Sequence, residues 1–468
     1  MPSAIKYIAP TDPQRNGFHG VAMQERLKRE RAYQRALGYY LDNHPNTIPI
    51  ELSADGTPQP NDNTHINLVK IVADRTVAFV FPDVPLVKQE GASLEPTYPE
   101  ELFSKIIEAS GGLQFLSKWV LRGFLSGHTF LRITPTNNLP KVTLLQPSAV
   151  TVFWRADDVG DVIWYENRFV VGDTTYIEDT VHEGEKWVTY TYTGTRVGYG
   201  LHNQPTTPVS TGTDTNIVYH VMGEPAISES PYSPIIDVPH LPHPDDYYGL
   251  GEFVDPTSQD LINRFASEIT SIVRKNSDPV DVIIGASPED IELGGNVYTI
   301  SNMGARVERL AMLGDLEALR ALFDRRVKLF LATARVVLLE GEAKDLQRVT
   351  NASVRTLFLD ALSKNNLLRD SYGRAIKHIV TLALQMLGER ETSLIVEWQD
   401  PLPTDAKEIA DVNAVMRSIG AMSARTASER LGLNPLYEER AIEDEDAKIL
   451  EKERAIEDKA TMLAQPLT

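Results

Sequence analysis

The sequence contains no cysteine and no long apolar run, and these two absences remove several classes of protein. Without cysteine there can be no disulfide and no zinc or iron–sulfur site with thiolate ligands. No apolar run approaches the ~18 residues that a membrane-spanning helix needs, and Met1–Pro10 lacks the basic and apolar parts of a secretory signal. We therefore expect a chain that is made and folded in the cytoplasm and has no membrane partner.

Motifs of the common nucleotide-dependent and hydrolytic enzymes are also missing. There is no GxxxxGK[ST] run for a P-loop and no G-x-S-x-G run for a nucleophile elbow. Gly111–Gly112 and Gly294–Gly295 are interpreted as turns and not as phosphate-binding loops. The ten histidines are scattered, so they do not by themselves indicate a catalytic triad. These absences favour a protein without enzymatic activity, and we expect no cofactor.

Basic side chains are in the minority, 46 against 65 acidic ones, which gives a formal charge of −19. Sequence-specific DNA-binding proteins usually carry a basic surface, and the chain as a whole lacks this excess of basic residues. Tight DNA binding is therefore not expected, whereas a surface along which DNA slides is compatible with few phosphate contacts. The 468 residues exceed one ordinary core, so about two to four structural units are expected.

The first 250 residues predict a mixed helical and β region. Helices are expected at residues 17–45 and 100–125, where apolar side chains recur at helical spacing. Asn67–Phe81 has a helical start and a β-branched end, so a helix that runs into a strand is expected there. Glu51–Asn63 is polar and contains Gly and Pro, which indicates a loop. From Gly127 the period changes to two, and short strands of an antiparallel meander are expected at Thr129–Thr134, Val142–Gln146, Val150–Arg155, Val162–Phe169 and Trp187–Tyr192.

The middle of the chain predicts two long helices that bracket a small β insert. The first helix, about 30 Å long, begins at Asp255–Pro256 after the proline-rich connector Pro231–Tyr248. The second begins near Asp315 and keeps its apolar stripe for about 37 Å. The strand-like segments Val280–Ile284 and Val297–Ile300 lie between the two helices. Two long helices around a β insert make a stalk with a head, which is the most informative organisation in the chain.

The last part of the chain is expected to be mainly helical. A polar break at Glu340–Ser353 precedes a third long helix from about Ala352 to Leu387. One strand is expected at Leu394–Trp398. Residues 438–459 are rich in acidic side chains and have little apolar stripe, so they are interpreted as a charged, solvated helix.

His240, His243 and Asp245 lie close together in the connector and are the best metal-ligating candidates. Zinc ligands usually lie on rigid elements and are supported by further hydrogen bonds. Here two prolines keep the chain extended and no further ligand cluster accompanies the three residues. A structural linker is therefore favoured and no metal site is expected, with a metal-dependent hydrolase as an alternative function.

The polar break between the second and third long helices contains side chains that can donate hydrogen bonds to phosphate. These side chains are Lys344, Gln347, Arg348 and Asn351. Taken alone, the segment is more simply interpreted as a solvated turn between helices.

The order of these elements resembles that of portal proteins of tailed bacteriophages: an α/β wing, a stem helix, a β-containing clip, a returning stem helix, a tunnel loop, a long helix and a helical crown. Local similarities are Asn67–Phe81 and Gly160–Tyr192 in the wing, Tyr248–Gly249 before the stem, and Ser423-Ala-Arg-Thr426-Ala-Ser-Glu429 in the crown. The resemblance extends from about Ala32 to Lys459. The chain departs from many relatives at Arg348–Ser353, where it lacks a Ser-Gly-x-Ala-Leu run, so the limits of the tunnel loop are open.

The resemblance implies an α+β, mainly helical portal fold that assembles as a ring. It divides the chain into the wing (1–250), the stem helix (251–277), the clip (278–313), the returning stem helix (314–340), the tunnel loop (341–353), a long helix and strand of the wing (354–403) and the crown (404–468).

For function, the resemblance implies a homo-oligomeric ring, usually a dodecamer, at one vertex of the capsid. Double-stranded genomic DNA passes through it without sequence specificity, packaged by a motor that contains the terminase large subunit and later ejected. A head-tail connector, the major capsid protein and a scaffolding protein are the other implied partners. The ring is assembled in the bacterial host cytoplasm and is located in the virion. Another virion structural protein, such as a capsid or tail component, is a further alternative.

About twelve copies at −19 each carry a total near −230, so the channel is expected mostly to repel DNA. The tunnel-loop residues expected to contact DNA are Lys344, Gln347, Arg348 and Asn351. The residues of the returning stem helix expected to line the channel are Arg320, Asp324, Lys328 and Arg335. The clip residues expected to bind terminase and connector are Val282, Ile284, Glu289, Asp290 and Val297. No catalytic residue is expected.

Overall fold

The structure is a computed structural model in which the chain divides into two compact units. One unit comprises residues 1–340 and 358–401, and the other comprises residues 341–357 and 402–468. The described residues are 9, 15–50, 52, 56–58, 61–91, 97–136, 139–155, 158–196, 217–244, 246–252, 256–277, 280–285, 287, 291–294, 297–300, 304–310, 316–337, 351–402, 406–420, 423 and 427.

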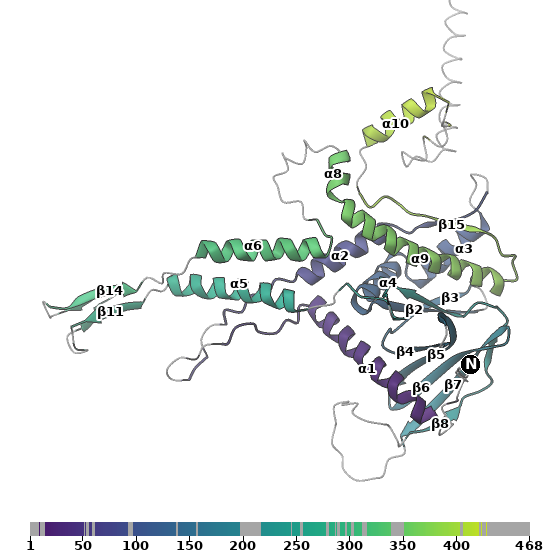
Figure 1. Ribbon diagram of the computed structural model, residues 1–468, viewed down its shortest axis with the longest axis horizontal. Coiled ribbons are helices and arrows are strands. Elements are labelled where there is room, and N and C mark those ends of the chain that lie inside the picture. The colour runs from purple at the N-terminus through teal and green to yellow at the C-terminus, as the bar shows by residue number, and fades with distance from the viewer. Residues whose placement is uncertain are drawn as a thin grey trace, which may run out of the picture. The chain divides into compact units, whose positions relative to one another are not determined.

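The body of the first unit is built from helices around one large apolar core (Figure 1). The helices are α1 (Arg15–Tyr40), α2 (Leu68–Val80), α3 (Tyr98–Ser110), α4 (Leu113–Ser126) and the long α9 (Leu359–Met386). Trp119 of α4 and Tyr372 of α9 are fully buried and meet edge to face, with ring centroids 4.9 Å apart. Aromatic pairs of this geometry add stability beyond the area that they bury.

Two of the expected helices differ from the prediction. Residues 100–125 form two helices and not one, because Gly111 and Gly112 have φ angles of 116° and 62° that end α3 and redirect the chain. Residues 67–81 form no strand. The Asn67 side chain accepts a hydrogen bond from the Lys70 N–H, and α2 continues through its β-branched residues to Val80. The buried face of α2 packs against the rest of the body, and this packing overrides local β propensity.

Three of the five antiparallel sheets in the described part of this unit belong to its body. The six-stranded meander has the order β4 (Val150–Arg155), β5 (Asp158–Val171), β6 (Thr174–Glu183), β7 (Lys186–Arg196) and β8 (Ile217–Val221), with β9 (Ala226–Ser228) paired to β7. A three-stranded sheet has the order β10 (Ile235–Pro239), β2 (His128–Thr134) and β3 (Lys141–Leu145), and β1 (Leu86–Gln89) pairs with β15 (Leu394–Glu397). Strands β4, β5 and β7 pair within the meander sheet as expected, whereas the expected strands β2 and β3 belong to the separate three-stranded sheet. Strands β1, β6, β8, β9 and β10 were not predicted.

The helix, β insert and helix expected in the middle of the chain are all present (Figure 1). Helices α5 (Pro256–Ser277) and α6 (Leu316–Thr333) lie side by side. Between them in sequence, β11 (Val280–Ile284) pairs with β14 (Arg306–Leu310), and β12 (Ile291–Gly294) pairs with β13 (Val297–Ile300). The mixed helical and β character predicted from the sequence is thereby confirmed.

The second unit contains the short helix α8 (Asn351–Leu357) and α10 (Ala406–Ser418) among its described residues. Asn413 of α10 is buried and donates a hydrogen bond from Nδ2 to the Ala427 carbonyl, 3.1 Å away. The third long helix expected from Ala352 is interrupted at Phe358, which precedes α9 as its N-cap. The acid-rich segment 438–459 lies outside the described residues. Among the described helices, none combines the length and apolar character that a membrane crossing requires.

Candidate functional site

Helix α6 has three different faces. Its packed face includes Val327 and Leu331, which join an apolar cluster with α1, α2 and α4. A second face carries Leu322 and Leu329, which are 38% and 58% exposed. These two leucines are seven residues apart and therefore lie on the same side of the helix. An apolar face thus remains uncovered on a helix that is already packed on another side.

The third face of α6 is charged and carries three of the four residues predicted to line a channel. Arg320, Asp324 and Lys328 follow one another at intervals of four residues, and all three are exposed. This spacing places them in one row along the helix. Arg335, the fourth residue, lies beyond the end of α6 and has a left-handed backbone with φ 55°.

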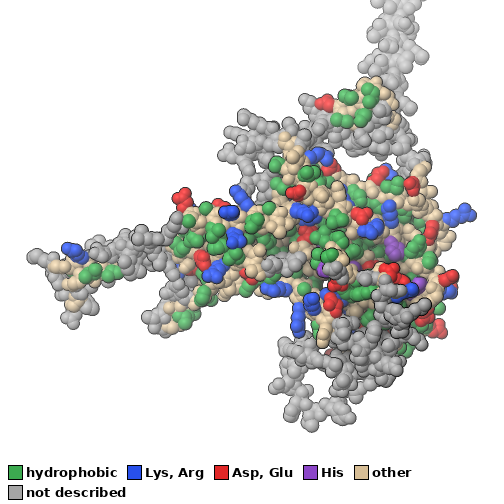
Figure 2. Space-filling model, in the orientation of Figure 1, with side chains coloured by type: hydrophobic (Ala, Val, Ile, Leu, Met, Phe, Trp, Pro, Cys, Tyr) green, Lys and Arg blue, Asp and Glu red, His purple; other side chains and the backbone are tan. Residues whose placement is uncertain are grey.

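The charge of α6 has the opposite sign to the net charge of the chain. Its exposed charged side chains are the basic Arg320, Arg325, Arg326 and Lys328 and the acidic Glu317 and Asp324. Figure 2 shows Lys and Arg side chains among hydrophobic ones over the α5 and α6 region. The −19 of the whole chain therefore does not describe this helix, whose exposed charges sum to a positive value.

The residues predicted for a tunnel loop fall almost entirely outside the described part of the chain. Lys344, Gln347 and Arg348 lie there, and Asn351 is the first residue of α8, with its side chain not described. Their contact with DNA stays a prediction.

Three of the five predicted clip residues lie in the two β ribbons of the insert. Val282 and Ile284 belong to β11, which pairs with β14, and the Ile284 side chain is 51% exposed. Val297 belongs to β13, which pairs with β12. Glu289 and Asp290 lie outside the described residues. An exposed apolar side chain at the end of an edge strand suits contact with another protein.

His240, the centre of the hypothetical metal cluster, is fully buried and has both ring nitrogens engaged. Nδ1 lies 2.9 Å from the Tyr372 hydroxyl, and Nε2 lies 2.9 Å from Oε1 of Glu252. Within the described residues, no group of three His, Asp or Glu side chains is arranged to hold a metal ion. Asp245 lies outside the described residues. His240 is thus part of a hydrogen-bond network, and the hydrolase hypothesis loses its central ligand.

The same network continues to the base of both stalk helices. Lys364 of α9 places Nζ 2.6 Å from Oε2 of Glu252, which lies shortly before α5. Nζ also donates to Oγ1 of Thr76 at 3.2 Å and to the carbonyl of Ala334, just after α6, at 3.0 Å. One buried ammonium group therefore links α2, α9 and the body-proximal ends of α5 and α6.

Two buried groups of this network, Glu252 and Tyr372, have shifted pKa values. Burial raises the pKa of Glu252, but the hydrogen bond from His240 and the charge of Lys364 outweigh burial and hold the pKa below its usual value. Burial, and then the nearby Glu252 charge, raise the pKa of Tyr372 well above its ordinary value. Ionised Glu252 only accepts hydrogen bonds, so Nε2 of His240 carries a proton.

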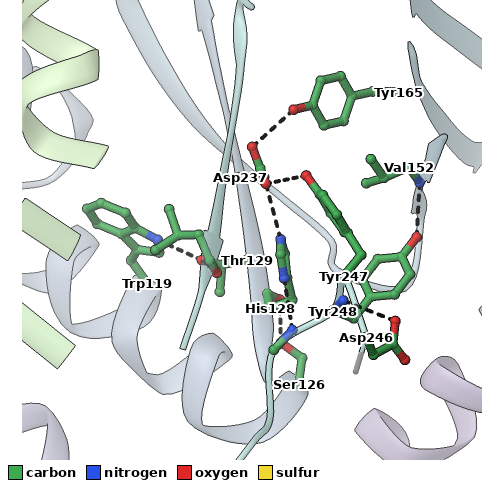
Figure 3. Close-up of polar contacts among 12 residues, drawn as sticks. Trp119, Ser126, His128, Thr129, Val152, Tyr165, Asp237, Asp246, Tyr247 and Tyr248 are labelled. Atoms are coloured by element: carbon green, nitrogen blue, oxygen red, sulfur yellow. Dashed lines mark hydrogen bonds and ion pairs between the residues drawn. The ribbon is translucent and has the colours of Figure 1, made fainter. Parts of the chain in front are cut away.

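A second buried network joins the three-stranded sheet to the meander (Figure 3). Tyr165 donates to Oδ1 of Asp237 at 3.0 Å, Tyr247 donates to Oδ2, and His128 Nε2 lies 3.7 Å from Oδ2. The Gly249 N–H donates to His128 Nδ1 at 3.2 Å, so the imidazole proton faces Asp237. Burial raises the pKa of Asp237, but His128 and the two tyrosines together lower it below its usual value.

The Tyr248–Gly249 pair, which contributed to the family resemblance, has a structural explanation. A Cβ on Gly249 would lie 2.5 Å from the carbonyl oxygen of Gly127, and a Cβ on Gly127 would lie 2.3 Å from that of Gly249. The two backbones therefore cross at a distance that only glycine permits. The Tyr248 hydroxyl accepts a hydrogen bond from the Val152 N–H at 3.0 Å. The pair thus fixes the connector ahead of α5 to both the α4–β2 junction and the meander.

Polar side chains along one face of α5 bind the extended segment 61–66. Asn263 Oδ1 accepts from the Ile66 N–H, and Ser267 Oγ accepts from the Thr64 N–H, both at 3.0 Å. Further contacts are Gln259 Nε2 to the Ile66 carbonyl at 2.6 Å and Arg274 Nε to both carboxylate oxygens of Asp62 at 2.9 Å. The sequence indicated only a loop at 51–63. The sequence feature that could have indicated this contact is the polar residue at every fourth position, 259, 263 and 267, of this helix.

Comparison with known proteins identifies the family. A model of the phage portal protein family described as SPP1 Gp6-like matches residues 23–458. The neck of a native gene transfer agent particle computed with C12 symmetry is 15% identical, with a TM-score of 0.42 and coverage of 78% of this chain and 88% of that chain. The neck of an empty particle of this kind computed with C6 symmetry is 16% identical, with a TM-score of 0.43 and the same coverage. No curated protein matches the sequence significantly.

The family match extends from within α1 through the meander, the α5–α6 stalk and α10, which are the elements that carried the resemblance. The expectation drawn from their order is confirmed: the chain belongs to the SPP1 Gp6-like family of phage portal proteins.

Proposed function

We propose that this portal protein forms a closed ring of identical subunits at one capsid vertex, through which double-stranded DNA enters and later leaves the virion. Membership of the portal family supports this role. The observation that carries the ring is the set of three faces on α6, since one subunit by itself covers only one of them.

The exposed apolar face of α6 is the contact with the neighbouring subunit in this proposal. Leu322 and Leu329 share that face and are the largest apolar side chains on it. Burying an aliphatic side chain of this size contributes about 1.5–3 kcal/mol. A contact between two different faces of the same chain continues from subunit to subunit until the ring closes, with about twelve copies as the expected number.

The charged row of α6 then faces the channel. Arg320 and Lys328 attract phosphate and Asp324 between them repels it, so the row contains both signs. Arg335 continues the positive charge beyond the helix. A surface of mixed sign allows DNA to slide, because few phosphates are held at once. Arg320, Lys328 and Arg335 outnumber Asp324, so this wall is less repulsive than the net charge of the chain implies.

The tunnel loop is proposed to follow α6 and to touch the DNA. Its candidate contacts are Lys344, Gln347, Arg348 and Asn351, all able to donate hydrogen bonds to phosphate. Replacement of both Lys344 and Arg348 by Ala is expected to lower DNA packaging in an assay with purified heads and terminase. Packaging at the wild-type level would exclude this role of the loop.

The β insert is proposed as the clip, the surface for the terminase large subunit during packaging and for the head-tail connector afterwards. Its candidate contacts are Val282, Ile284, Glu289, Asp290 and Val297. The wing (1–250) is proposed to contact the major capsid protein and the scaffolding protein. ATP hydrolysis belongs to the terminase, which is consistent with the lack of a P-loop motif in this chain.

Negative-stain electron microscopy of the purified chain, with solution mass measured in parallel, tests this proposal. We expect rings with a central hole and a mass of about a dozen subunits. Particles no larger than a dimer at every concentration, also after addition of scaffolding and capsid proteins, would contradict it.

A further inference from the structure

Two histidines lie where the end of α1, the linker 42–48 that follows it and segment 61–66 meet α5. The His44 side chain has no exposed surface, and neither of its ring nitrogens has a hydrogen-bond partner among the described residues. Nε2 of His65 is also buried without such a partner there. Buried polar atoms without partners are rare in folded proteins, and each one calls for a physical explanation.

The aromatic rings of this junction connect three separate parts of the chain. Tyr39, in the last turn of α1, meets His44 edge to face, with ring centroids 4.9 Å apart. The His65 ring of segment 61–66 lies next to His44, with centroids 5.6 Å apart. The Tyr39 hydroxyl donates a hydrogen bond to Oδ1 of Asp260 on α5 at 2.6 Å. His44 therefore contacts the rings that join α1 to α5 and to the segment.

Four backbone amides close to the two histidines have acceptors within this junction. The N–H groups of Thr64 and Ile66 donate to side chains of α5, both at 3.0 Å. The N–H groups of Thr47 and Ile48 donate to Oδ1 of Asn63 at 2.8 and 3.0 Å. These four hydrogen bonds hold the linker and the segment in place, so the hydrogen exchange of the four amides reports whether the junction is closed.

The charged groups around His44 make a buried imidazolium unfavourable. Nε2 lies 3.4 Å from Oδ1 of Asp42, whose side chain is 67% exposed, so this countercharge lies largely in solvent. The Asp260 carboxylate already accepts the Tyr39 hydroxyl. Burial lowers the pKa of His44 below its ordinary value, and the charge of His65 adds to this effect. Together they outweigh the charges of Asp42 and Asp260, which raise the pKa.

We propose that His44 is an acid-sensitive latch between α1 and α5, which opens when its imidazole is protonated. A charged imidazole at a site without exposed surface lacks solvation. It gains solvation by moving outwards to Asp42 and water, and it then leaves Tyr39 and His65. The linker and segment 61–66 thereby lose their hold on α5. This inference concerns a single subunit and goes beyond the proposed function, so it does not depend on the ring.

The latch opens as the pH falls. The pKa of His44 is lower in the folded chain than the unfolded value of about 6.5, so neutral His44 stabilises the junction above that value. This contribution is lost as the pH falls towards the folded value. Glu252, whose pKa is lowered as well, stays ionised at about pH 5.5, so its network at the base of the stalk remains intact there.

Hydrogen exchange of the full-length chain, measured by mass spectrometry, tests the latch. Protection is compared at about pH 7.5 and about pH 5.5, corrected for the intrinsic exchange rates, in peptides that contain residues 47–48 and 64–66. We expect a several-fold loss of protection in acid in both peptides. Equal protection at the two pH values would overturn the inference.

Two matched substitutions assign the acid effect to one histidine. His44→Phe keeps a ring against Tyr39 and cannot be protonated, so protection should no longer depend on pH in this range. No hydrogen bond is lost, because the ring nitrogens of His44 have no partners among the described residues. His378→Phe is the control, since burial also lowers the pKa of this histidine on α9. It should keep the acid-induced loss in both peptides.

His65→Gln provides a variant that leaves His44 in place. It removes only the neighbouring charge, which lowers the pKa of His44, so the acid-induced loss should be smaller than in the unmodified chain but still present. A structural role of the two rings alone would not change the dependence on pH. An undiminished loss in either His44→Phe or His65→Gln would assign the acid effect to another group and overturn the latch.

Discussion

The two helices of the stalk, α5 and α6, differ in how much of their surface is covered by contacts within one subunit. Helix α5 binds segment 61–66 through a row of polar side chains, with Asn263 and Ser267 both buried. Within the described part of the chain, α6 shows no comparable row and leaves Leu322 and Leu329 exposed. Helix α5 is thus fixed within its own subunit, whereas α6 leaves two faces exposed, which the proposed ring assigns to a neighbouring subunit and to DNA.

The proposed ring needs two properties from these helices, a fixed position within each subunit and exposed faces for assembly. A helix held by hydrogen bonds to its own chain keeps its position when the neighbours change. In the proposed ring, a helix with an apolar and a charged face gains stability on assembly and presents its charges to the lumen. The network of Glu252, Lys364 and Ala334 joins the two helices at their base.

Lys364→Met is expected to have the largest effect on stability, because both helices depend on this ammonium group. The substitution leaves Glu252 buried without its countercharge, which costs about 3–5 kcal/mol. Denaturant unfolding of the unassembled subunit measures the loss. As a control, Lys105→Met removes the exposed partner of Glu101 on α3 and should change stability little. Equal effects of the two substitutions would contradict the role given to the network.

The same network predicts acid sensitivity. The pKa of Glu252 is lowered in the folded state, so its contribution is present above the unfolded value of about 4.3 and is lost as pH falls towards the folded value. Glu252→Gln should make stability less dependent on pH in that acid range.

Leu329→Asp is expected to abolish ring assembly and leave the subunit folded. The substitution puts a charge into the proposed subunit contact, where it would be buried without a partner. Solution mass measures assembly. The free energy of unfolding of the subunit is expected to change by less than about 0.5 kcal/mol. Ile227→Asp, at a similarly exposed apolar position in the meander, is the matched control and should still assemble.

Asn263→Ala should destabilise the subunit by about 1–3 kcal/mol, since it leaves the Ile66 N–H without its acceptor. Unfolding of the subunit tests this effect, and assembly of the remaining folded protein should be normal. Arg264→Ala, which removes only an exposed ion pair with Glu268 on the same helix, is the control. A larger effect on assembly than on folding would reverse the roles assigned to α5 and α6.

Replacement of both Arg320 and Lys328 by Ala is expected to have the smallest effect on the protein itself. Neither stability nor assembly should change measurably, because both side chains are exposed. DNA translocation through the ring should become less sensitive to salt, since fewer phosphate contacts remain. The same salt dependence in the variant and in the native ring would show that the charged row does not face DNA.

Periodicity and element order were enough to predict the stalk and the meander. The apolar stripes of α5 and α6 and the alternation from Gly127 are local patterns, and local patterns persist in the fold. The prediction of a single helix at 100–125 was wrong because Gly111 has a positive φ that ends the first helix, although the apolar pattern continues.

The buried networks could not be predicted, because their members are far apart in the sequence. His240 was assigned to a structural linker, with metal binding beside His243 as the alternative, but its hydrogen-bond partner Tyr372 lies 132 residues away and was not foreseen. Asn263 likewise pairs with a segment 197 residues earlier. A buried polar side chain needs a hydrogen-bond partner, but the sequence does not show which residue that partner is. The sequence therefore indicated candidate residues and not their contacts.

Thiol labelling of adjacent positions on α6 tests most directly whether a neighbouring subunit covers the apolar face of this helix. Lys328→Cys and Leu329→Cys are prepared separately in the cysteine-free chain, and each is labelled as a subunit and as a ring. Both cysteines should react in the subunit. In the ring, Cys at 329 should be protected while Cys at 328 stays reactive in the lumen. Equal reaction of the two positions in the ring would contradict the assignment of these faces.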